Sequence, residues 1–177
     1  WYGSFTPLAD RETMMAQHLY GFERTPSCAC DACKDKCAHV SGMVTPQDLL
    51  LWQRALDTGW EAWAAQHLAA SPGALVMQKG KVSRLHTIVM ARDGQGACVM
   101  FLRNGDCAMH AEAPYGCSHF DCTMDQHEGH QRSQVALVDI AYDWATNGPY
   151  SQLWAQLQAL GKTVEAPEVA RQRLRHP

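Results

Sequence analysis

The sequence predicts an α+β fold in which helices pack around a small antiparallel sheet and a large cysteine-rich loop region. Three observations support this class. Apolar residues recur at helical spacing on both sides of the middle of the chain. Short apolar runs bounded by glycine, which are typical of strands, lie between them. The eight cysteines gather in two groups: the first lies in a stretch too dense in Cys, Asp and Lys for a regular element, and the second begins in a strand and continues through irregular chain. The 177 residues suit one domain, residues 1–177, with a sizeable core.

Two helices are expected in the N-terminal half. Asp10 can cap a helix that continues to about Tyr20. Thr45 is a favourable cap for a second helix, because the proline that follows suits the first helical position. Apolar and tryptophan residues continue at helical spacing over residues 46–70, and Gly59 is the point where this helix can break.

Three short strands follow, at residues 75–77, 85–90 and 97–102. The turn formers Ser71-Pro72-Gly73 precede the first strand, Gly80 joins it to the second, and Asn104-Gly105 ends the third. Two further helices are expected at residues 131–144 and 151–160, separated by Asn147-Gly148-Pro149. No internal repeat is expected.

The charge pattern excludes some classes of partner. The chain has 15 Lys and Arg against 18 Asp and Glu, which gives a net charge of −3 with no basic run. Nucleic acid and membrane surfaces are therefore not expected as partners. No apolar run reaches the ~18 residues that a spanning helix requires.

The cysteines are the main candidate functional residues. The first group comprises Cys28, Cys30, Cys33 and Cys37, and the second Cys98, Cys107, Cys117 and Cys122. Thiols spaced by two or three residues suit convergence on one metal better than pairing with each other. Metal binding is therefore expected, in a reducing, cytoplasmic compartment, with a secreted disulfide framework as the alternative.

The two groups together resemble a known family. The pattern is Cys30-x-x-Cys33-x-x-x-Cys37, followed by Gly105-Asp106-Cys107 and by Pro114-Tyr115-Gly116-Cys117-Ser118-His119-Phe120-Asp121-Cys122. Over residues 28–122 it resembles the YkgJ-type cysteine-cluster family, which carries a CxxCxxCC signature and is described as zinc- or iron-chelating. The third cysteine of that signature falls at Lys36, and we expect Cys28 to replace it.

The resemblance implies a thiolate site for an iron–sulfur cluster or for zinc, with all eight cysteines as candidate ligands. We favour iron–sulfur because the gaps in the first group are similar to those of ferredoxins. Zinc would instead suit two closed four-thiolate sites. Eight thiols exceed the needs of one ordinary cluster, so a second site, a larger cluster or inert thiols all stay open.

Other residues are weaker candidates. His110, His119, His127 and His130 border the second group, where a histidine can be a ligand, a hydrogen-bond donor beside the site or a surface residue. A thioredoxin-like pair at Cys30 and Cys33 is disfavoured because no βαβ context surrounds it.

The expected function is that of a metal-cluster protein in electron transfer or an accessory, maturation role, with a redox partner or client protein. The alternatives are a zinc-stabilised interaction module and a metalloenzyme related to cluster-containing methyl-transfer proteins. No catalytic residue can be assigned from the sequence.

Overall fold

The computed structural model describes residues 19–25, 30–56, 59–78, 80–166 and 169. The elements in chain order are η1 (Leu19–Gly21), α2 (Asp31–His39), β1 (Met43–Val44), α3 (Pro46–Leu56), α4 (Trp60–His67), β2 (Leu68–Gln78), β3 (Lys81–Met90), η2 (His110–Glu112), α5 (Tyr115–Ser118), α6 (Gln126–Thr146) and α7 (Pro149–Ala159). The predicted α+β class is confirmed. No helix in these described ranges is long and apolar enough to cross a membrane.

The sheet has three antiparallel strands in the order β1-β3-β2. Strand β3 is central: Ile88 is paired with Val44 of β1 on one side and with Ala70 of β2 on the other. Successive residues point to opposite faces of a strand. Ile88 and Ala70 therefore face the main core, while Val89 contributes to a smaller apolar cluster on the other face.

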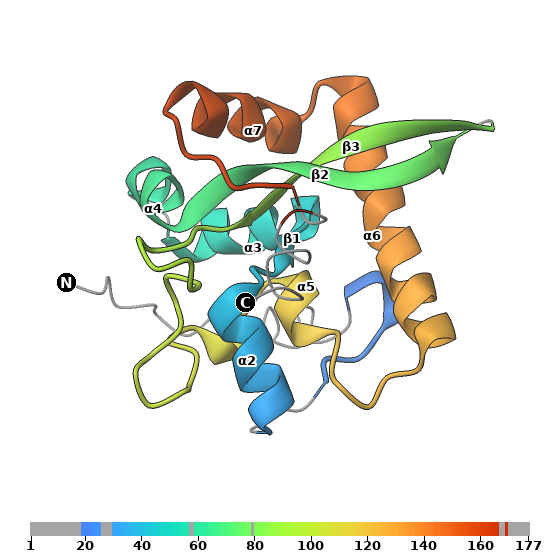
Figure 1. The fold of residues 1–177 in the computed structure, drawn as a ribbon. Coiled ribbons are helices and arrows are strands. Elements are labelled where there is room, and N and C mark those ends of the chain that lie inside the picture. The colour runs from blue at the N-terminus through green and yellow to red at the C-terminus, as the bar shows by residue number, and fades with distance from the viewer. Residues whose placement is uncertain (1–18, 26–29, 57–58, 79, 167–168, 170–177) are drawn as a thin grey trace.

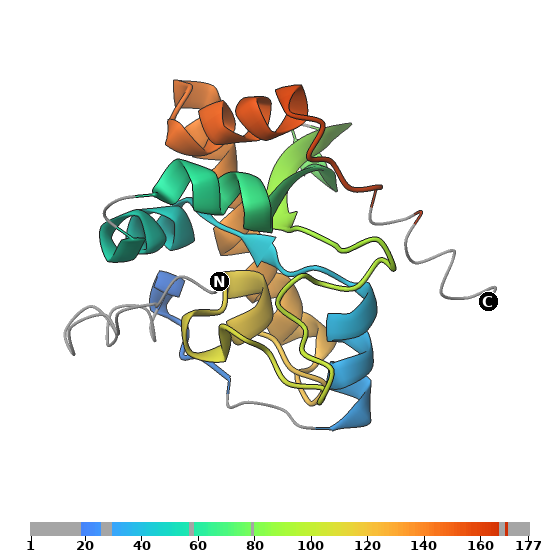
Figure 2. The ribbon, with the colours of Figure 1, turned by 90° about the vertical axis from the view of Figure 1, so that its left-hand side faces the viewer.

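The helices divide the molecule into two parts (Figures 1 and 2). Helices α3, α4 and α7 surround the β2–β3 hairpin, which projects past α6 in Figure 1. Helices α2 and α5 gather with the chain between β3 and α6 at the opposite end, and α6 runs along both parts. The second part holds the cysteines of both groups that the structure describes.

Buried polar groups connect these elements. The hydroxyl of the buried Tyr150, on α7, accepts a hydrogen bond from the Ile88 N–H (2.6 Å) and donates one to the Val44 carbonyl (3.0 Å). It therefore joins α7 to two strands at once. The Asp143 carboxylate, on α6, accepts hydrogen bonds from the N–H groups of Tyr150 (3.2 Å) and Ser151 (2.8 Å). These donors lie in the first turn of α7, where backbone N–H groups lack helical partners.

The helix predicted over residues 46–70 is right at its start and wrong at its end. Helix α3 ends at Leu56 and α4 begins at Trp60, directly after the break expected at Gly59. Residues 68–78 form a strand, and the turn predicted at Ser71-Pro72-Gly73 is an irregularity in its register with β3. Neighbouring apolar residues here are buried in two different clusters, so both faces of the strand are apolar. An apolar run without polar alternation fits either a helix or a strand, which explains the error.

Other boundaries also differ from expectation. Residues 97–102 contain isolated bridges in place of the predicted third strand. The first cysteine group was expected to be irregular, yet Asp31–His39 form α2. Helix α6 begins at Gln126, five residues before the predicted start, and Asn147 ends it in the left-handed conformation (φ 53°). The helix expected from Asp10 lies outside the described residues except at its last two positions, which belong to η1.

Candidate metal centre

Two consecutive hairpin turns of the same shape present Cys98 and Cys107. In the first, the Asp93 N–H donates to the Ala97 carbonyl (2.8 Å); in the second, the Leu102 N–H donates to the Asp106 carbonyl (2.8 Å). The second hydrogen bond of each turn also corresponds. The Gly96 N–H donates to the Asp93 carbonyl (3.0 Å), and the Gly105 N–H donates to the Leu102 carbonyl (2.9 Å). Both glycines have a φ of 88°, which favours glycine over other residues.

Each cysteine follows its glycine by two residues and forms an isolated antiparallel bridge, Cys98 with Arg92 and Cys107 with Phe101. The pattern Gly-x-Cys-x-Met occurs at residues 96–100 and again at 105–109. The expectation of no internal repeat is therefore wrong: a nine-residue repeat brings two thiols to equivalent places. The recurring motif is the sequence signal that could have revealed it.

The same geometry places a backbone donor at each of these thiols. The N–H of Met100 is hydrogen-bonded to the sulfur of Cys98, and that of Met109 to the sulfur of Cys107. Burial raises the pKa of Cys98 to about 11 and also raises the pKa of Cys107, while both N–H donors act in the opposite direction. Both methionine side chains are themselves buried.

Helix α2 supplies a third thiol, Cys37. The helix packs against the second hairpin, because a Cβ added at Gly105 would lie 3.2 Å from the Lys34 Cδ. Cys37 keeps an exposed side chain, and its pKa is nevertheless raised by partial burial. Its negative charge, when present, raises the pKa of Cys98, Cys107 and Cys117.

The fourth thiol, Cys117, lies on α5 and packs directly against the chain that leaves α2. An ideal Cβ at Gly42 would lie 2.0 Å from the Cys117 Sγ, and one at Gly116 would lie 2.3 Å from the Met43 nitrogen. Only glycine permits this approach of the two segments. Burial raises the pKa of Cys117 well above its usual value, and charges on Cys98, Cys37 and Cys107 raise it further.

A buried carboxylate aligns α5 with α3. Asp48 accepts hydrogen bonds from the Thr45 N–H (2.7 Å) and hydroxyl (2.8 Å), and the Thr45 hydroxyl in turn accepts from the Asp48 N–H (3.3 Å). This reciprocal arrangement is a capping box with aspartate at the third helical position. Both Asp48 carboxylate oxygens also accept from the Tyr115 N–H at 3.1 Å. The start of α5, two residues before Cys117, is thereby fixed to α3.

We call Cys37, Cys98, Cys107 and Cys117 the four-thiol centre. One member comes from the first cysteine group and three from the second. The sulfur atoms of Cys30 and Cys122, one from each group, lie 3.4 Å apart, so the two groups meet in the fold. Across the residues that the structure describes, no three Cys, His, Asp or Glu side chains are placed so that they could already hold a metal ion. The donor chemistry fits a soft metal, because the centre offers four sulfur atoms of which two receive N–H donors.

Two further thiols form a separate contact. The sulfur atoms of Cys30 and Cys122 lie 3.4 Å apart, and both side chains are exposed. Cys28 lies outside the described residues, and for Cys33 the structure describes the backbone in α2 but not the side chain. The assignment of all eight cysteines to metal therefore stays a prediction, with six of them placed.

The candidate histidines have different surroundings. His119 is buried; its ring stacks on Tyr115 (centroids 4.4 Å apart), and its Nδ1 is 2.8 Å from the Ser118 hydroxyl. These contacts give it a packing role. His110 lies in η2 and is exposed, and His127 and His130 are exposed on α6.

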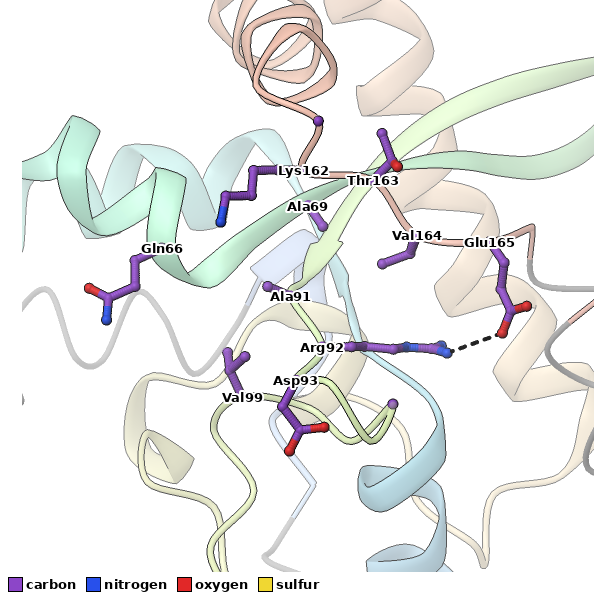
Figure 3. Close-up of a pocket in the computed structure, with 12 residues that line it drawn as sticks. Gln66, Ala69, Ala91, Arg92, Asp93, Val99, Lys162, Thr163, Val164 and Glu165 are labelled. Atoms are coloured by element: carbon purple, nitrogen blue, oxygen red, sulfur yellow. Dashed lines mark ion pairs between the residues drawn. The ribbon is translucent and has the colours of Figure 1, made fainter.

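A surface pocket is lined in part by the first hairpin (Figure 3). The Arg92 guanidinium forms an ion pair with Glu165 (3.6 Å), and its Nε donates to the Ser41 hydroxyl (3.2 Å). Arg92 also opposes the rise in the Cys98 pKa through its positive charge. Lys162 and Asp93 line the same pocket. The sequence patterns did not indicate this pocket, since its walls come from segments far apart in the chain.

Comparison with known proteins adds no identity: no protein-family model, curated protein or solved structure matches this chain.

Proposed function

We propose that this chain is a cysteine-ligated metal-cluster protein in which the four-thiol centre binds an iron–sulfur cluster. The observation that carries the proposal is that four cysteines, from helix α2, two equivalent hairpins and helix α5, lie near enough to affect one another's charge electrostatically. Thiolate is the ordinary protein ligand of iron–sulfur clusters, and four are required for the common types. When bound, such a cluster supplies one-electron transfer.

A bound cation would change the charge state of these thiols. Without one, burial and mutual repulsion favour the neutral form of Cys98 and Cys117. A metal reverses this preference, because it stabilises the thiolate directly. The N–H groups of Met100 and Met109 then donate to sulfur atoms that carry negative charge. Hydrogen bonds to sulfur and limited solvent exposure are the main protein influences on the potential of a cluster.

The proposed role is electron transfer or an accessory, maturation function with a protein partner in a reducing, cytoplasmic setting. The exposed side chain of Cys37 supports contact with a partner, since it leaves one edge of the centre at the surface. The resemblance of residues 28–122 to the YkgJ-type family is a second support.

The proposal is tested by purifying the protein without oxygen and measuring iron, sulfide and zinc together with the visible absorption. We expect iron, sulfide and a broad charge-transfer absorption that disappears on oxidation or chelation. Cys98→Ser and Cys107→Ser should lose most of the metal, because serine is a poor ligand for soft metals. The neighbouring Ala108→Ser, at an exposed position in the same hairpin, is the matched control and should keep it.

Colourless protein with stoichiometric zinc would instead establish the zinc-stabilised module, because zinc–thiolate does not absorb in the visible range. Protein that takes up neither metal after reconstitution, or Cys98→Ser with unchanged metal content, would refute the metal centre itself.

A further inference from the structure

We propose that Cys30 and Cys122 form a redox-active thiol pair, distinct from the four-thiol centre, which closes to a disulfide between the start of α2 and the segment joining α5 to α6. This inference does not depend on which metal the centre binds.

The distance between the two sulfur atoms supports closure. They lie 3.4 Å apart, so they must approach by about 1.4 Å to reach the ~2.05 Å of a disulfide bond. The two residues are separated by 92 positions in the sequence, so the contact results from the tertiary fold. Both side chains are exposed and can be reached by a dissolved oxidant.

Both cysteines are held by ordered backbone. Cys30 immediately precedes α2, and its carbonyl accepts the first helical hydrogen bond from the Lys34 N–H (3.1 Å). On the other side, the Asp121 carboxylate accepts from the N–H groups of Thr123 (2.7 Å) and Met124 (3.0 Å), and this turn encloses Cys122. Small side-chain rotations can therefore bring the sulfur atoms together while helix and turn stay in place.

The pair is also set apart from the four-thiol centre. Cys37 follows Cys30 by seven residues, which corresponds to about 10 Å along an α-helix. Two thiolates on one metal ion lie at most ~4.6 Å apart, twice the metal–sulfur bond length. Cys30 is in direct contact with Cys122. A single metal ion therefore cannot bind both Cys30 and Cys37, and the metal content of the Cys30 and Cys122 variants tests whether a cluster does.

The oxidation is a thiol–disulfide exchange with a low-molecular-weight disulfide such as oxidised glutathione. One thiol of the pair loses its proton to solvent, and the thiolate attacks a glutathione sulfur, which releases one glutathione thiolate and leaves a mixed disulfide. The second thiol, deprotonated in the same way, attacks the protein sulfur of that mixed disulfide and releases the other glutathione. The protein is oxidised by two electrons, and one oxidised glutathione becomes two reduced molecules.

The experiment exposes the purified protein to glutathione buffers of increasing oxidised fraction, blocks remaining thiols with N-ethylmaleimide and maps the cross-links by tandem mass spectrometry. Digestion at basic residues and at aspartates suits this sequence. It isolates Cys122 on residues 121–124 and separates Cys30 from Cys33 at Asp31. Cys28 shares the Cys30 fragment, so the same mapping is repeated on Cys28→Ser.

We expect a Cys30–Cys122 cross-link that becomes the main form under oxidising conditions, persists in Cys28→Ser and disappears on reduction. In Cys122→Ser the cross-link should be absent, and Cys30 should carry glutathione instead. Metal content should be unchanged in both Cys30→Ser and Cys122→Ser, in contrast with Cys98→Ser.

Two results would overturn the inference. The first is the absence of a Cys30–Cys122 cross-link at every glutathione ratio, or pairing of Cys30 with Cys28 or Cys33. The second is a loss of metal in Cys30→Ser and Cys122→Ser as large as in Cys98→Ser, which would make the pair metal ligands. Failure of the proposed metal centre has a different signature, because metal would then be missing while the cross-link still forms.

Discussion

Substitution of Gly42 by alanine tests the position of the Cys117 thiol. An added Cβ would lie 2.0 Å from the Cys117 Sγ and 3.1 Å from its backbone nitrogen. Non-bonded heavy atoms normally lie ~3.5–4.0 Å apart, so the sulfur must move by about 1.5 Å or more. Gly42 does not have a positive φ, so alanine brings no backbone strain of its own. The effect of Gly42→Ala should therefore be local and steric.

The thiol can escape the new methyl group by rotating to another side-chain conformation or by shifting with α5. Overpacking of this kind costs about 1–3 kcal/mol of the free energy of unfolding. Metal binding is far less tolerant, since metal–ligand distances must stay within ~0.2 Å of their preferred values. We expect Gly42→Ala to fold but to bind metal about 10–100-fold more weakly.

The assay compares metal content, visible absorption and thermal unfolding for the wild type, Gly42→Ala and the control Gly94→Ala. Gly94 lies in the turn of the first hairpin, and an added Cβ there meets no atom within 4 Å. The control should match the wild type in all three measurements. Full metal content in Gly42→Ala would show that Cys117 is not a ligand or does not lie against Gly42, and the reasoning would fail.

Two other predictions concern stability. Burial raises the pKa of Asp48 from 3.8 to about 6, although hydrogen bonds from Thr45 and Tyr115 oppose this. The folded state therefore binds the proton more tightly than the unfolded state. The advantage of the wild type over Asp48→Asn, measured by urea unfolding, should fall by about 1–3 kcal/mol as pH rises from about 4 to 6; a constant difference would contradict it. Tyr150→Phe should lower the free energy of unfolding by about 1–3 kcal/mol, because it leaves two buried backbone groups without their hydroxyl partner. Tyr142→Phe, at a side chain 69% exposed, is its control and should change little; equal effects would refute the Tyr150 prediction.

Local sequence signals were reliable where the backbone itself determines the structure. Thr45 and Pro46 mark the start of α3, and Asn147-Gly148-Pro149 separates α6 from α7. These signals act through caps and allowed dihedral angles, which depend on neighbours in the chain.

The density of cysteine in residues 28–37 was a misleading signal. It indicated irregular chain, because metal-binding thiols commonly lie on tight turns. Residues 31–39 nevertheless satisfy their backbone groups as a helix, which separates Cys30 from Cys37 by seven helical positions. The secondary structure of these residues decided which thiols face each other.

The sequence by itself determined the α+β class and the caps, and it predicted that thiols in two distant groups are the chemically important residues. Only the tertiary structure decided that Cys37 joins Cys98, Cys107 and Cys117 while Cys30 contacts Cys122. The physical reason is that this partition depends on close approaches between segments, such as Gly42 against Cys117 and Gly105 against Lys34. It also depends on Asp48, whose buried carboxylate joins two helices 67 positions apart. Spacing along the chain fixes neither kind of contact, because both depend on how separate elements pack.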